Sequence, residues 1–542
     1  MPNPVTAARA ATRDTSAAPS TVSSTRPAGL ADDAAYRALE SRDVRFDGRV
    51  WFGVTTTGIY CRPVCPAQTP KRTNVRFFAS PSAAVASGFR ACRRCRPDSA
   101  PGTREWDHRG DLVSRALRGI AEGAVDESGV SGLARRLHVS ERHLHRTLNA
   151  TVGAGPLQLA TSRRAQTARL LIDQTGLPLT DIAYAAGFAS IRQFNDVMLR
   201  QFGVAPSQLR RRQQPQLPAD SPDLVLRLNY REPFDTEAMG GFLAARTLRG
   251  VEEHIASDSA ATSWSHRRAL RLRHCVVDVV VAPVPRKTQY AVRVRDIDLR
   301  DIAELVARIR RWLDLDADPA SINSVLAADS SLRPLVESRP GLRVSQTPDT
   351  FEGIVRTIVG QQISVGGALT LLARVVATVH SRSGEGSAES AKHAEDSESA
   401  EDTVRIKPFP RADELATYSI ADWRTSGFTG ARAETLKTLC GAVAAGDIDL
   451  DGDADRDDLC RGLGRIKGVG PWTIAYVRLR VLTDPDAFPA TDLVVRRNAE
   501  AIGIRGPELV EHALRWQPWR AYAATQLWNH DPTQSASSGR SQ

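Results

Sequence analysis

Four cysteines lie close together in the sequence, in two pairs whose spacing suits a metal ion. Three residues separate Cys61 from Cys65, and two residues separate Cys92 from Cys95. Zn²⁺ prefers four tetrahedral ligands and binds well to two such pairs of thiolates. In a cytosolic chain, where thiols stay reduced, such a cluster indicates a metal site more readily than disulfides. We therefore predict one zinc ion held by four cysteines, a spacing that also fits a purely structural zinc site.

The sequence around these cysteines is strongly basic. Residues 61–100 carry eight lysine and arginine side chains against one acidic side chain, Asp98. A zinc ion with four thiolates keeps a net negative charge, so basic neighbours are expected even around a structural site. The same side chains would attract DNA phosphates, and this leaves a DNA-binding site as the second interpretation.

A second candidate for chemistry is Asp492, in the segment Phe-Pro-Ala-Thr-Asp-Leu-Val-Val that begins at Phe488. A lone aspartate before an apolar run is usually a helix N-cap. Twenty residues before it stands Trp472, which follows the turn Gly468-Val-Gly470 between two helical segments. Glycines in such a turn let the backbone approach a DNA phosphate, and amides at the start of the next helix can bind it.

Two similar helix-turn-helix patterns occur in the first half of the chain. In residues 130–150, apolar side chains three and four apart define one buried face, and Ser140 can cap the second helix. In the second copy, Ser190 and Gln193 form a capping-box signature. Basic side chains that would face outward on the second helices are Arg142, Arg146 and Arg192. A plain helical bundle has the same pattern, so the pattern alone leaves both interpretations open.

The helices and strands expected around these residues indicate a multidomain, mainly α fold with α+β parts. Strand-like runs occur at Val50–Val54 and Cys275–Val281, alternation begins at Leu224, and the chain is mostly helical from Pro334. The predicted units are a disordered tail (1–30), a small zinc-bound α/β module (31–105), a double helix-turn-helix domain (106–212), a linker (213–222), a β-rich domain (223–333), a helical domain (334–530) with a disordered acidic insert (381–402), and a second tail (531–542).

Composition narrows the class of partner. The chain has 542 residues, a formal net charge of +10 and a pI of about 9.5, which favours a polyanion such as DNA, although a basic surface also suits an anionic membrane. It contains no run of about 20 apolar residues, and its first thirty residues lack the apolar core of a signal peptide. We therefore expect a cytoplasmic, nucleoid-associated monomer that binds no membrane.

Resemblances to known families extend these expectations. The stretches Thr55–Cys65 (TTTGIYCRPVC) and Gly88–Pro97 (GFRACRRCRP) resemble the N-terminal domain of the Ada regulator family. That resemblance implies that Cys61 is both a zinc ligand and a nucleophile, which accepts a methyl group from a methylphosphotriester in DNA. The other three cysteines would complete the zinc site. Methylation would remove negative charge from the site and so raise its affinity for DNA.

The second resemblance covers residues 110–212. The stretch Ile182–Phe188 (IAYAAGF), followed by Phe194 and by Phe202–Pro206 (FGVAP), resembles the AraC-family DNA-binding domain. This family places two recognition helices in successive major grooves, and the resemblance implies the same arrangement here.

The third resemblance covers residues 222–530, apart from the acidic insert. Leu463–Thr473 (LGRIKGVGPWT) together with Phe488–Val495 resembles the helix-hairpin-helix DNA glycosylase superfamily, in particular the 3-methyladenine DNA glycosylase II (AlkA) type. Its β-rich N-terminal domain matches the segment that starts at Leu224. Two further stretches, Arg339–Arg343 and Val359–Val365, resemble the central helices of that family.

This third resemblance implies roles for individual residues. Asp492 would be the essential carboxylate, which stabilises the oxocarbenium-like sugar and directs water to it. The damaged base would be flipped into an aromatic pocket, with a wedge in the emptied stack. The pocket residues would be Trp472, Tyr476 and Trp528, the DNA-binding hairpin residues Gly468 and Gly470, and the wedge Gln362. Bifunctional relatives carry a lysine at the position of Trp472, so we expect a monofunctional glycosylase.

These features together predict a fusion of an adaptive-response regulator with an alkylpurine DNA glycosylase. Its partners would be alkylated and promoter double-stranded DNA, with RNA polymerase added if the chain activates transcription. One alternative is a repair enzyme whose N-terminal modules serve only DNA binding and phosphotriester repair. Another is a regulator with an inactive glycosylase, against which Asp492 and the aromatic set argue. The sequence has no Pro-Cys-His-Arg motif, so we predict no O6-alkylguanine repair.

Overall fold

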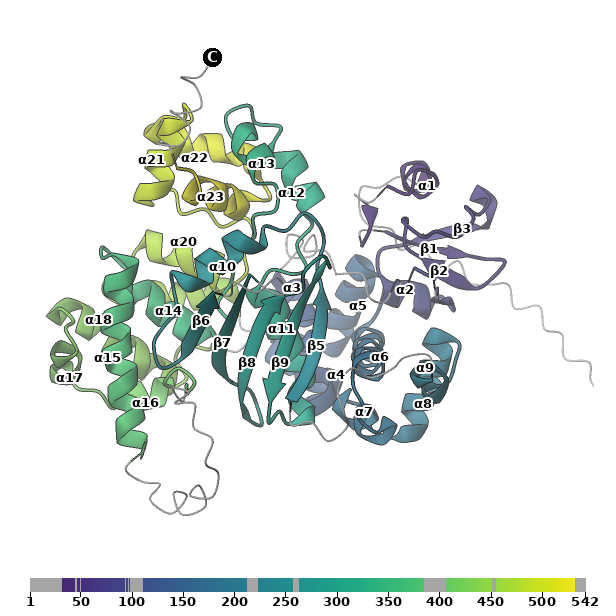
Figure 1. The fold of residues 1–542 in the computed structure, drawn as a ribbon, viewed down its shortest axis with the longest axis horizontal. Helices are drawn as coiled ribbons and strands as arrows, with labels where there is room; N and C mark the ends of the chain where they lie inside the picture. Colours follow the sequence, from purple (N-terminus) through teal and green to yellow (C-terminus); the bar gives the residue numbers. More distant parts are fainter. Residues whose placement is uncertain are drawn as a thin grey trace, which may run out of the picture.

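The chain folds into a multidomain, mainly helical structure with two small sheets, as the sequence predicts (Figure 1). The computed structural model describes residues 32–43, 46–48, 50–92, 94–95, 97, 111–211, 223–256, 263–384, 406–450 and 455–531. The predicted first tail and the predicted linker lie outside the described residues, as do most of the acidic insert and most of the second tail.

The first sheet brings the two cysteine pairs together. The elements of this module are α1 (Asp32–Glu40), β1 (Trp51–Val54), β2 (Ile59–Cys61), β3 (Val75–Phe78), α2 (Pro81–Ala86) and β4 (Arg90–Ala91). The strand order is β3-β1-β2-β4, with β1 antiparallel to its neighbours and β2 parallel to β4. Tyr60 pairs with Ala91, so Cys61 at the end of β2 and Cys92 directly after β4 are brought side by side.

In residues 111–211, the described part of the double helix-turn-helix domain, the chain forms seven helices. They are α3 (Asp111–Ala121), α4 (Ala124–Arg136), α5 (Glu141–Val152), α6 (Pro156–Gln174), α7 (Leu179–Ala185), α8 (Ile191–Phe202) and α9 (Pro206–Arg210). Both predicted caps form, because Ser140 accepts from His143 N and Ser190 accepts from Gln193 N, each at 3.2 Å. The side chain of Gln193 accepts from Ala189 N, one residue before the N-cap that an ideal capping box would use.

The second sheet has five antiparallel strands in the order β5-β9-β8-β7-β6. Its strands are β5 (Asp223–Asn229), β6 (Glu252–Ala256), β7 (Trp264–Arg271), β8 (Val276–Pro283) and β9 (Gln289–Arg295), with α10 (Thr236–Ala244) and α11 (Ile302–Trp312) packed beside them. In β8 buried and more exposed residues alternate, the pattern expected of a strand with one face on the core. Gln174 of α6 bonds both backbone groups of Arg227 on β5, and so the helix-turn-helix domain covers this edge of the sheet.

Two groups of helices complete the chain, and α20 lies between them (Figure 1). The first group comprises α14 (Thr350–Val359), α15 (Val365–Gly384), α16 (Ala412–Ala416), α17 (Ile420–Thr425), α18 (Gly430–Ala444) and α19 (Arg456–Gly464). The second comprises α12 (Pro319–Leu326), α13 (Arg333–Ser338), α21 (Leu493–Ala501), α22 (Leu509–His512) and α23 (Arg520–Trp528). Helix α20 (Pro471–Arg480) buries Val477 in the first core and Leu479 in the second.

Three local predictions need correction. Arg339–Arg343 is a connecting segment and not a central helix, because α13 ends at Ser338. The stretch Val359–Val365 joins two helices, with residues 360–364 in a loop between α14 and α15. The predicted insert also begins too early, since α15 continues to Gly384.

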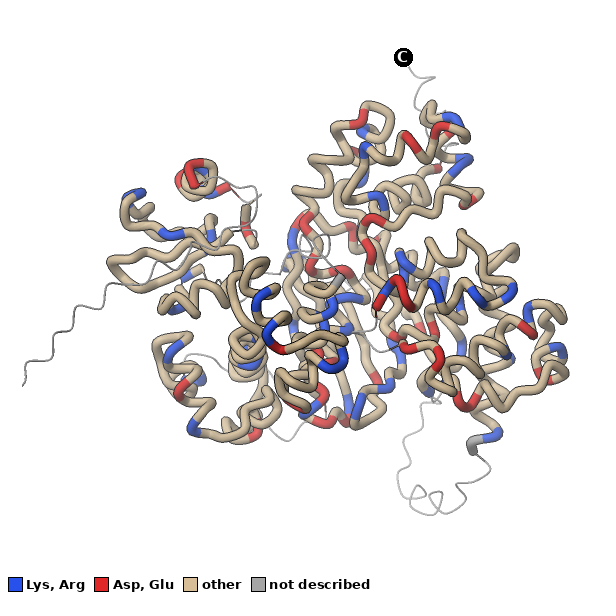
Figure 2. Tube along the Cα trace, turned by 180° about the vertical axis from the view of Figure 1, so that it is seen from behind, with Lys and Arg blue, Asp and Glu red and all other residues tan. Residues whose placement is uncertain are grey.

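Basic and acidic residues are interspersed along the described chain, as Figure 2 shows. The net positive charge nevertheless comes from the N-terminal half of the sequence, because residues 31–212 carry 28 basic and 16 acidic side chains, whereas residues 223–530 carry 40 basic and 43 acidic ones. Among the described helices, none is long and apolar enough to span a membrane.

Candidate active site and metal centre

Asp492 is both a helix cap and the meeting point of two tryptophans. It is the N-cap of α21, and its Oδ1 accepts hydrogen bonds from the backbone amides of Val494 and Val495, each at 3.0 Å. Trp472 Nε1 donates to its Oδ2, and Trp528 Nε1 donates to its Oδ1, again at 3.0 Å. The plain N-cap interpretation is thus correct for the backbone, but the two indoles give the carboxylate a fixed orientation that a cap does not require.

The two indoles come from different helices. Trp472 lies in the first turn of α20, and Trp528 is the last residue of α23. Because α20, α21 and α23 pack together, they bring three separate parts of the sequence to one carboxylate. Asp492, Trp472 and Trp528 are all partly exposed, so the group lies at the surface of the protein.

Tyr476 completes the aromatic set. It lies one helical turn after Trp472, and the two rings stack with centroids 5.2 Å apart and an interplanar angle of 28°. The Tyr476 ring is tilted by 58° to Trp528 at 5.8 Å. The structure thus brings together Asp492 and all three predicted pocket residues: Tyr476 lies against both tryptophan rings, and the two indole nitrogens bond the carboxylate.

Arg480 is a member of this cluster that the sequence did not reveal. It is 7% exposed, and its guanidinium carbon lies 5.0 Å from the ring centroid of Trp528 and 4.5 Å from that of Phe242. Burial lowers the pKa of Arg480, and its Nη1 donates to Ser345 O at 2.9 Å. The sequence spacing could have identified it: Arg480 lies four residues after Tyr476 and eight after Trp472, and positions with this spacing share one side of a helix.

The hairpin between α19 and α20 has the geometry expected for phosphate binding. Gly468 has φ = +96°, and a Cβ there would lie 2.4 Å from Thr435 Oγ1, so glycine is required at this position. Gly470 is the N-cap of α20, and it has no side chain that could bond the first-turn amides. Those amides are therefore available to an anion at the helix N-terminus.

The predicted wedge residue stands at the tip of a loop. Gln362 is exposed in the loop between α14 and α15, and its φ of +55° is in the left-handed region, which non-glycine residues rarely adopt. The predicted contacts of the helix-turn-helix domain are also exposed: Arg142 and Arg146 lie on α5, and Arg192 lies on α8.

The four cysteines form a compact, buried group. Their sulfur atoms all lie within 4.8 Å of one another, and the sulfurs of Cys65 and Cys92 are 4.0 Å apart. Zn–S bonds of about 2.3 Å in a tetrahedron place the sulfurs about 3.8 Å apart, so the group fits one zinc ion. Hydrogen bonding to Cys65 raises the pKa of Cys61, while the hydrogen bond with Cys61 lowers the pKa of Cys92. With a bound cation all four sulfurs could be thiolates, whereas without one four negative charges this close would repel one another.

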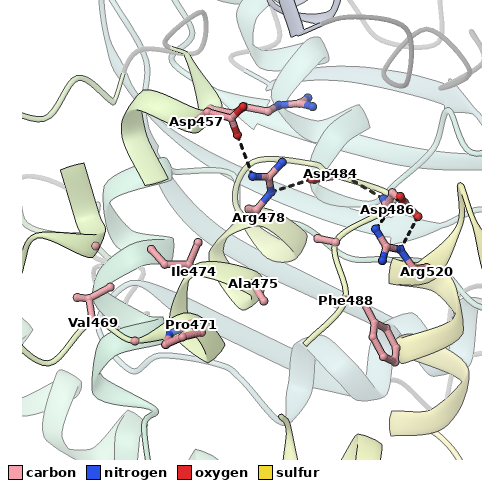
Figure 3. A pocket seen from close by; sticks show the side chains of 14 residues that line it. Asp457, Val469, Pro471, Ile474, Ala475, Arg478, Asp484, Asp486, Phe488 and Arg520 are labelled. Atoms are coloured by element: carbon pink, nitrogen blue, oxygen red, sulfur yellow. Dashed lines mark hydrogen bonds and ion pairs between the residues drawn. The ribbon is translucent and has the colours of Figure 1, made fainter. Parts of the chain in front are cut away.

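A separate cleft of about 810 Å³ lies on another face of α20 (Figure 3). Pro471, Ile474 and Arg478 line it from α20, whereas the Trp472 indole bonds Asp492 and Tyr476 stacks on Trp472. Two of its three arginines form ion pairs: Arg478 lies 2.9 Å from both Asp457 and Asp484, and Arg520 lies 2.8 Å from Asp486. Its lining residues do not include Asp492 or the aromatic set, so this cleft is distinct from the candidate active site.

Comparisons with known proteins match each part of the chain. The family model of the metal binding domain of Ada matches residues 34–98, a helix-turn-helix domain matches residues 133–212, and the AlkA N-terminal domain matches residues 225–349. The chain is 42% identical over 502 residues to a probable bifunctional transcriptional activator/DNA repair enzyme AlkA of Mycobacterium tuberculosis, covering 91% of this chain and 95% of that relative.

Two further relatives each match part of the chain. DNA-3-methyladenine glycosylase 2 of Escherichia coli is 29% identical over 303 residues, which cover 56% of this chain and 95% of the relative. Regulatory protein ada of Salmonella typhimurium is 30% identical over 295 residues, which cover 54% of this chain and 78% of the relative.

Proposed function

The chain belongs to the family of bifunctional transcriptional activators and DNA repair enzymes of the AlkA type, and we propose that Asp492 is the catalytic carboxylate of its glycosylase. The glycosylase is of the 3-methyladenine type. The observation that carries the assignment of Asp492 is the convergence of the Trp472 and Trp528 indoles on its two carboxylate oxygens.

The proposed reaction follows from charge. Alkylation of a ring nitrogen makes the purine cationic, so the electrons of the breaking N-glycosidic bond neutralise the departing base. Positive charge develops on the sugar, and the Asp492 carboxylate stabilises it there. Water then adds to C1′ and gives up a proton, for which the carboxylate is the nearby acceptor. The two indole hydrogen bonds hold the carboxylate in one orientation through these steps.

The base is selected before the bond breaks. The nucleotide must leave the helix, and the faces of Trp472, Tyr476 and Trp528 would stack on the flipped base. An electron-deficient, cationic purine gains more from an aromatic face than a neutral purine does, by about 0.5–2 kcal/mol per ring. Trp472 has no amine for a Schiff base with the sugar, so the product is an abasic site in an uncut strand.

The same enzyme is proposed to transfer methyl groups at its N-terminal module. The Cys61 sulfur attacks the methyl carbon of a methylphosphotriester, the S–C bond forms, the C–O bond breaks and a phosphodiester leaves. When bound, zinc keeps the cysteine sulfurs deprotonated and thus nucleophilic. The compact four-cysteine group supports this proposal.

Loss of negative charge at Cys61 would then strengthen DNA binding by the N-terminal half. We propose that α5 and α8 read promoter DNA through Arg142, Arg146 and Arg192, and that the chain contacts RNA polymerase as a monomer at that promoter. The units proposed to carry these activities are 31–105 for methyl transfer, 106–212 for promoter binding, and 223–530 for base excision.

Two assays test the proposed activities separately. Incubation with methylated duplex DNA should release free alkylpurine and leave abasic sites without strand cleavage. Incubation with DNA that carries labelled methylphosphotriesters should move one label per chain onto the protein. Strand cleavage without added base or heat would contradict the monofunctional assignment.

A further inference from the structure

The residue that precedes the wedge joins the wedge loop to the DNA-binding hairpin. Gln361 follows the end of α14, and its side-chain Nε2 donates to Gly468 O at 3.0 Å and to Thr473 Oγ1 at 2.6 Å. These two acceptors lie 107 and 112 residues away in the sequence. One is in the hairpin turn and the other is in the first turn of α20, so a single amide spans both sides of the phosphate-binding turn.

Helix α18 supports both ends of this junction. Arg432 on α18 donates to the backbone carbonyl of Gln361. One turn later on the same helix, Thr435 Oγ1 donates to Lys467 O at 2.8 Å, directly before the hairpin glycine. The wedge loop and the hairpin are thus attached to each other and to one common helix.

This arrangement explains how an exposed residue keeps a strained backbone. Gln362 has φ = +55° at the tip of the loop, and such a conformation persists only where neighbouring contacts fix it. The contacts that fix it are those of Gln361, because its side chain and its carbonyl are both bonded. Thr473, which is 2% exposed, offers a rigid acceptor within the fold.

We propose that Gln361 is a positioning residue for base flipping. It holds the wedge residue Gln362 at a fixed distance from the phosphate that the hairpin binds. This proposal rests on the proposed function, in which the hairpin binds backbone phosphate and Gln362 fills the emptied stack. Flipping requires both actions at once, since the wedge must enter the stack while the strand is held. A misplaced wedge leaves the active-site carboxylate intact but lowers the fraction of nucleotides that reach it.

The test compares a paired substrate with one that is already unstacked. Gln361→Met keeps the length of the side chain but removes its hydrogen bonds. With a duplex that carries one N7-methylguanine opposite cytosine, we expect single-turnover base release to fall about 10–100-fold. With N7-methylguanine opposite an abasic site, where extrusion costs less, we expect a loss of less than about 3-fold. Thr473→Val should produce the same substrate-dependent loss.

Controls separate this role from general damage to the fold. Gln289→Ala removes another glutamine amide, one that bonds Asn229 in the second sheet, and should release base from both substrates at the wild-type rate. Equal losses on the paired and unstacked substrates, whether or not the thermal midpoint falls, would overturn the positioning role, as would no loss on either. If wild type itself releases no base, the proposed function has failed and not this inference alone.

Discussion

The indole nitrogen of Trp528 donates a 3.0 Å hydrogen bond to the carboxylate of Asp492, although 36 positions separate the two residues in the sequence. Trp472, 20 positions before Asp492, makes the matching bond to the other carboxylate oxygen. Aromatic residues that were expected only to stack on a base therefore also orient the group that acts on the sugar. Under the proposed function, base recognition and catalysis would share the same two side chains.

The first prediction separates these two roles of Trp528. Trp528→Phe keeps an aromatic face but removes the N–H that holds Asp492. We expect the single-turnover rate of base release to fall about 10-fold, because the carboxylate loses its orientation, while the affinity for abasic DNA stays unchanged. Trp423→Phe is the matched control, since the Trp423 N–H has no partner among the described residues and lies in a separate core. A wild-type rate for Trp528→Phe would contradict the orienting role.

The second prediction concerns Cys61. Cys61→Ser should take up no methyl label from methylphosphotriester DNA, because a serine hydroxyl is not ionised near neutral pH. Base release should remain at the wild-type rate, since the two reactions use separate modules. Cys275→Ser, which removes a half-buried cysteine outside the zinc group, should accept one label as wild type does. Undiminished uptake by Cys61→Ser would rule out this sulfur as the acceptor.

The third prediction concerns the buried charges that anchor α14, the helix before the wedge loop. Arg268 on β7 bonds Glu252 at 2.8 Å and Glu352 at 2.6 Å, and Arg356 on α14 bonds the same two carboxylates. Arg268→Met leaves two buried carboxylates with one partner, which should destabilise the fold by about 3–5 kcal/mol. Arg505→Met, which breaks an exposed pair with Glu508, should cost less than about 1 kcal/mol.

The same network of buried charges should make the stability of α14 depend on pH. Burial would raise the pKa of Glu252, but Arg356 and Arg268 outweigh it and hold this pKa well below the ordinary value of 4.5. A carboxyl group with a lowered pKa stabilises the folded state above its ordinary pKa, and that contribution is lost as the pH falls further. The hydrogen-exchange protection factors of the α14 amides, which are corrected for the slower intrinsic exchange in acid, should therefore fall below pH 4.5, and Glu252→Gln should flatten this dependence. A flat profile for wild type would contradict the account of the network.

Short-range features of this structure could be predicted from the sequence. The caps at Ser140 and Ser190, the strand near Val50 and the two cysteine pairs each depend on residues a few positions apart. The ends of helices were harder to predict from the sequence. Helix α15 continues into a stretch with serine and glycine, where Arg382 pairs with Asp422 of α17 and lies over the Tyr418 ring, and such tertiary contacts override weak local propensity.

The contacts that turn Asp492 into a candidate active site could not be predicted in the same way. Trp528, Arg480 and Gln361 reach their partners only after α20, α21 and α23 have packed and the wedge loop has met the hairpin. Each of these residues has an ordinary alternative in the sequence, as a core aromatic, a surface arginine or a loop amide. Their roles depend on tertiary distances that no local spacing encodes.

The central claim is that the charge of Asp492 drives base release. Asn is as good an N-cap as Asp, so Asp492→Asn should keep α21 capped and the thermal midpoint close to that of wild type. The most direct measurement is single-turnover release of 3-methyladenine from methylated duplex DNA by wild type and Asp492→Asn, with abasic-DNA affinity measured in parallel. We predict at least a 100-fold loss of rate, on the order of other electrostatic stabilisers, with binding retained. Release by Asp492→Asn at the wild-type rate would contradict the account.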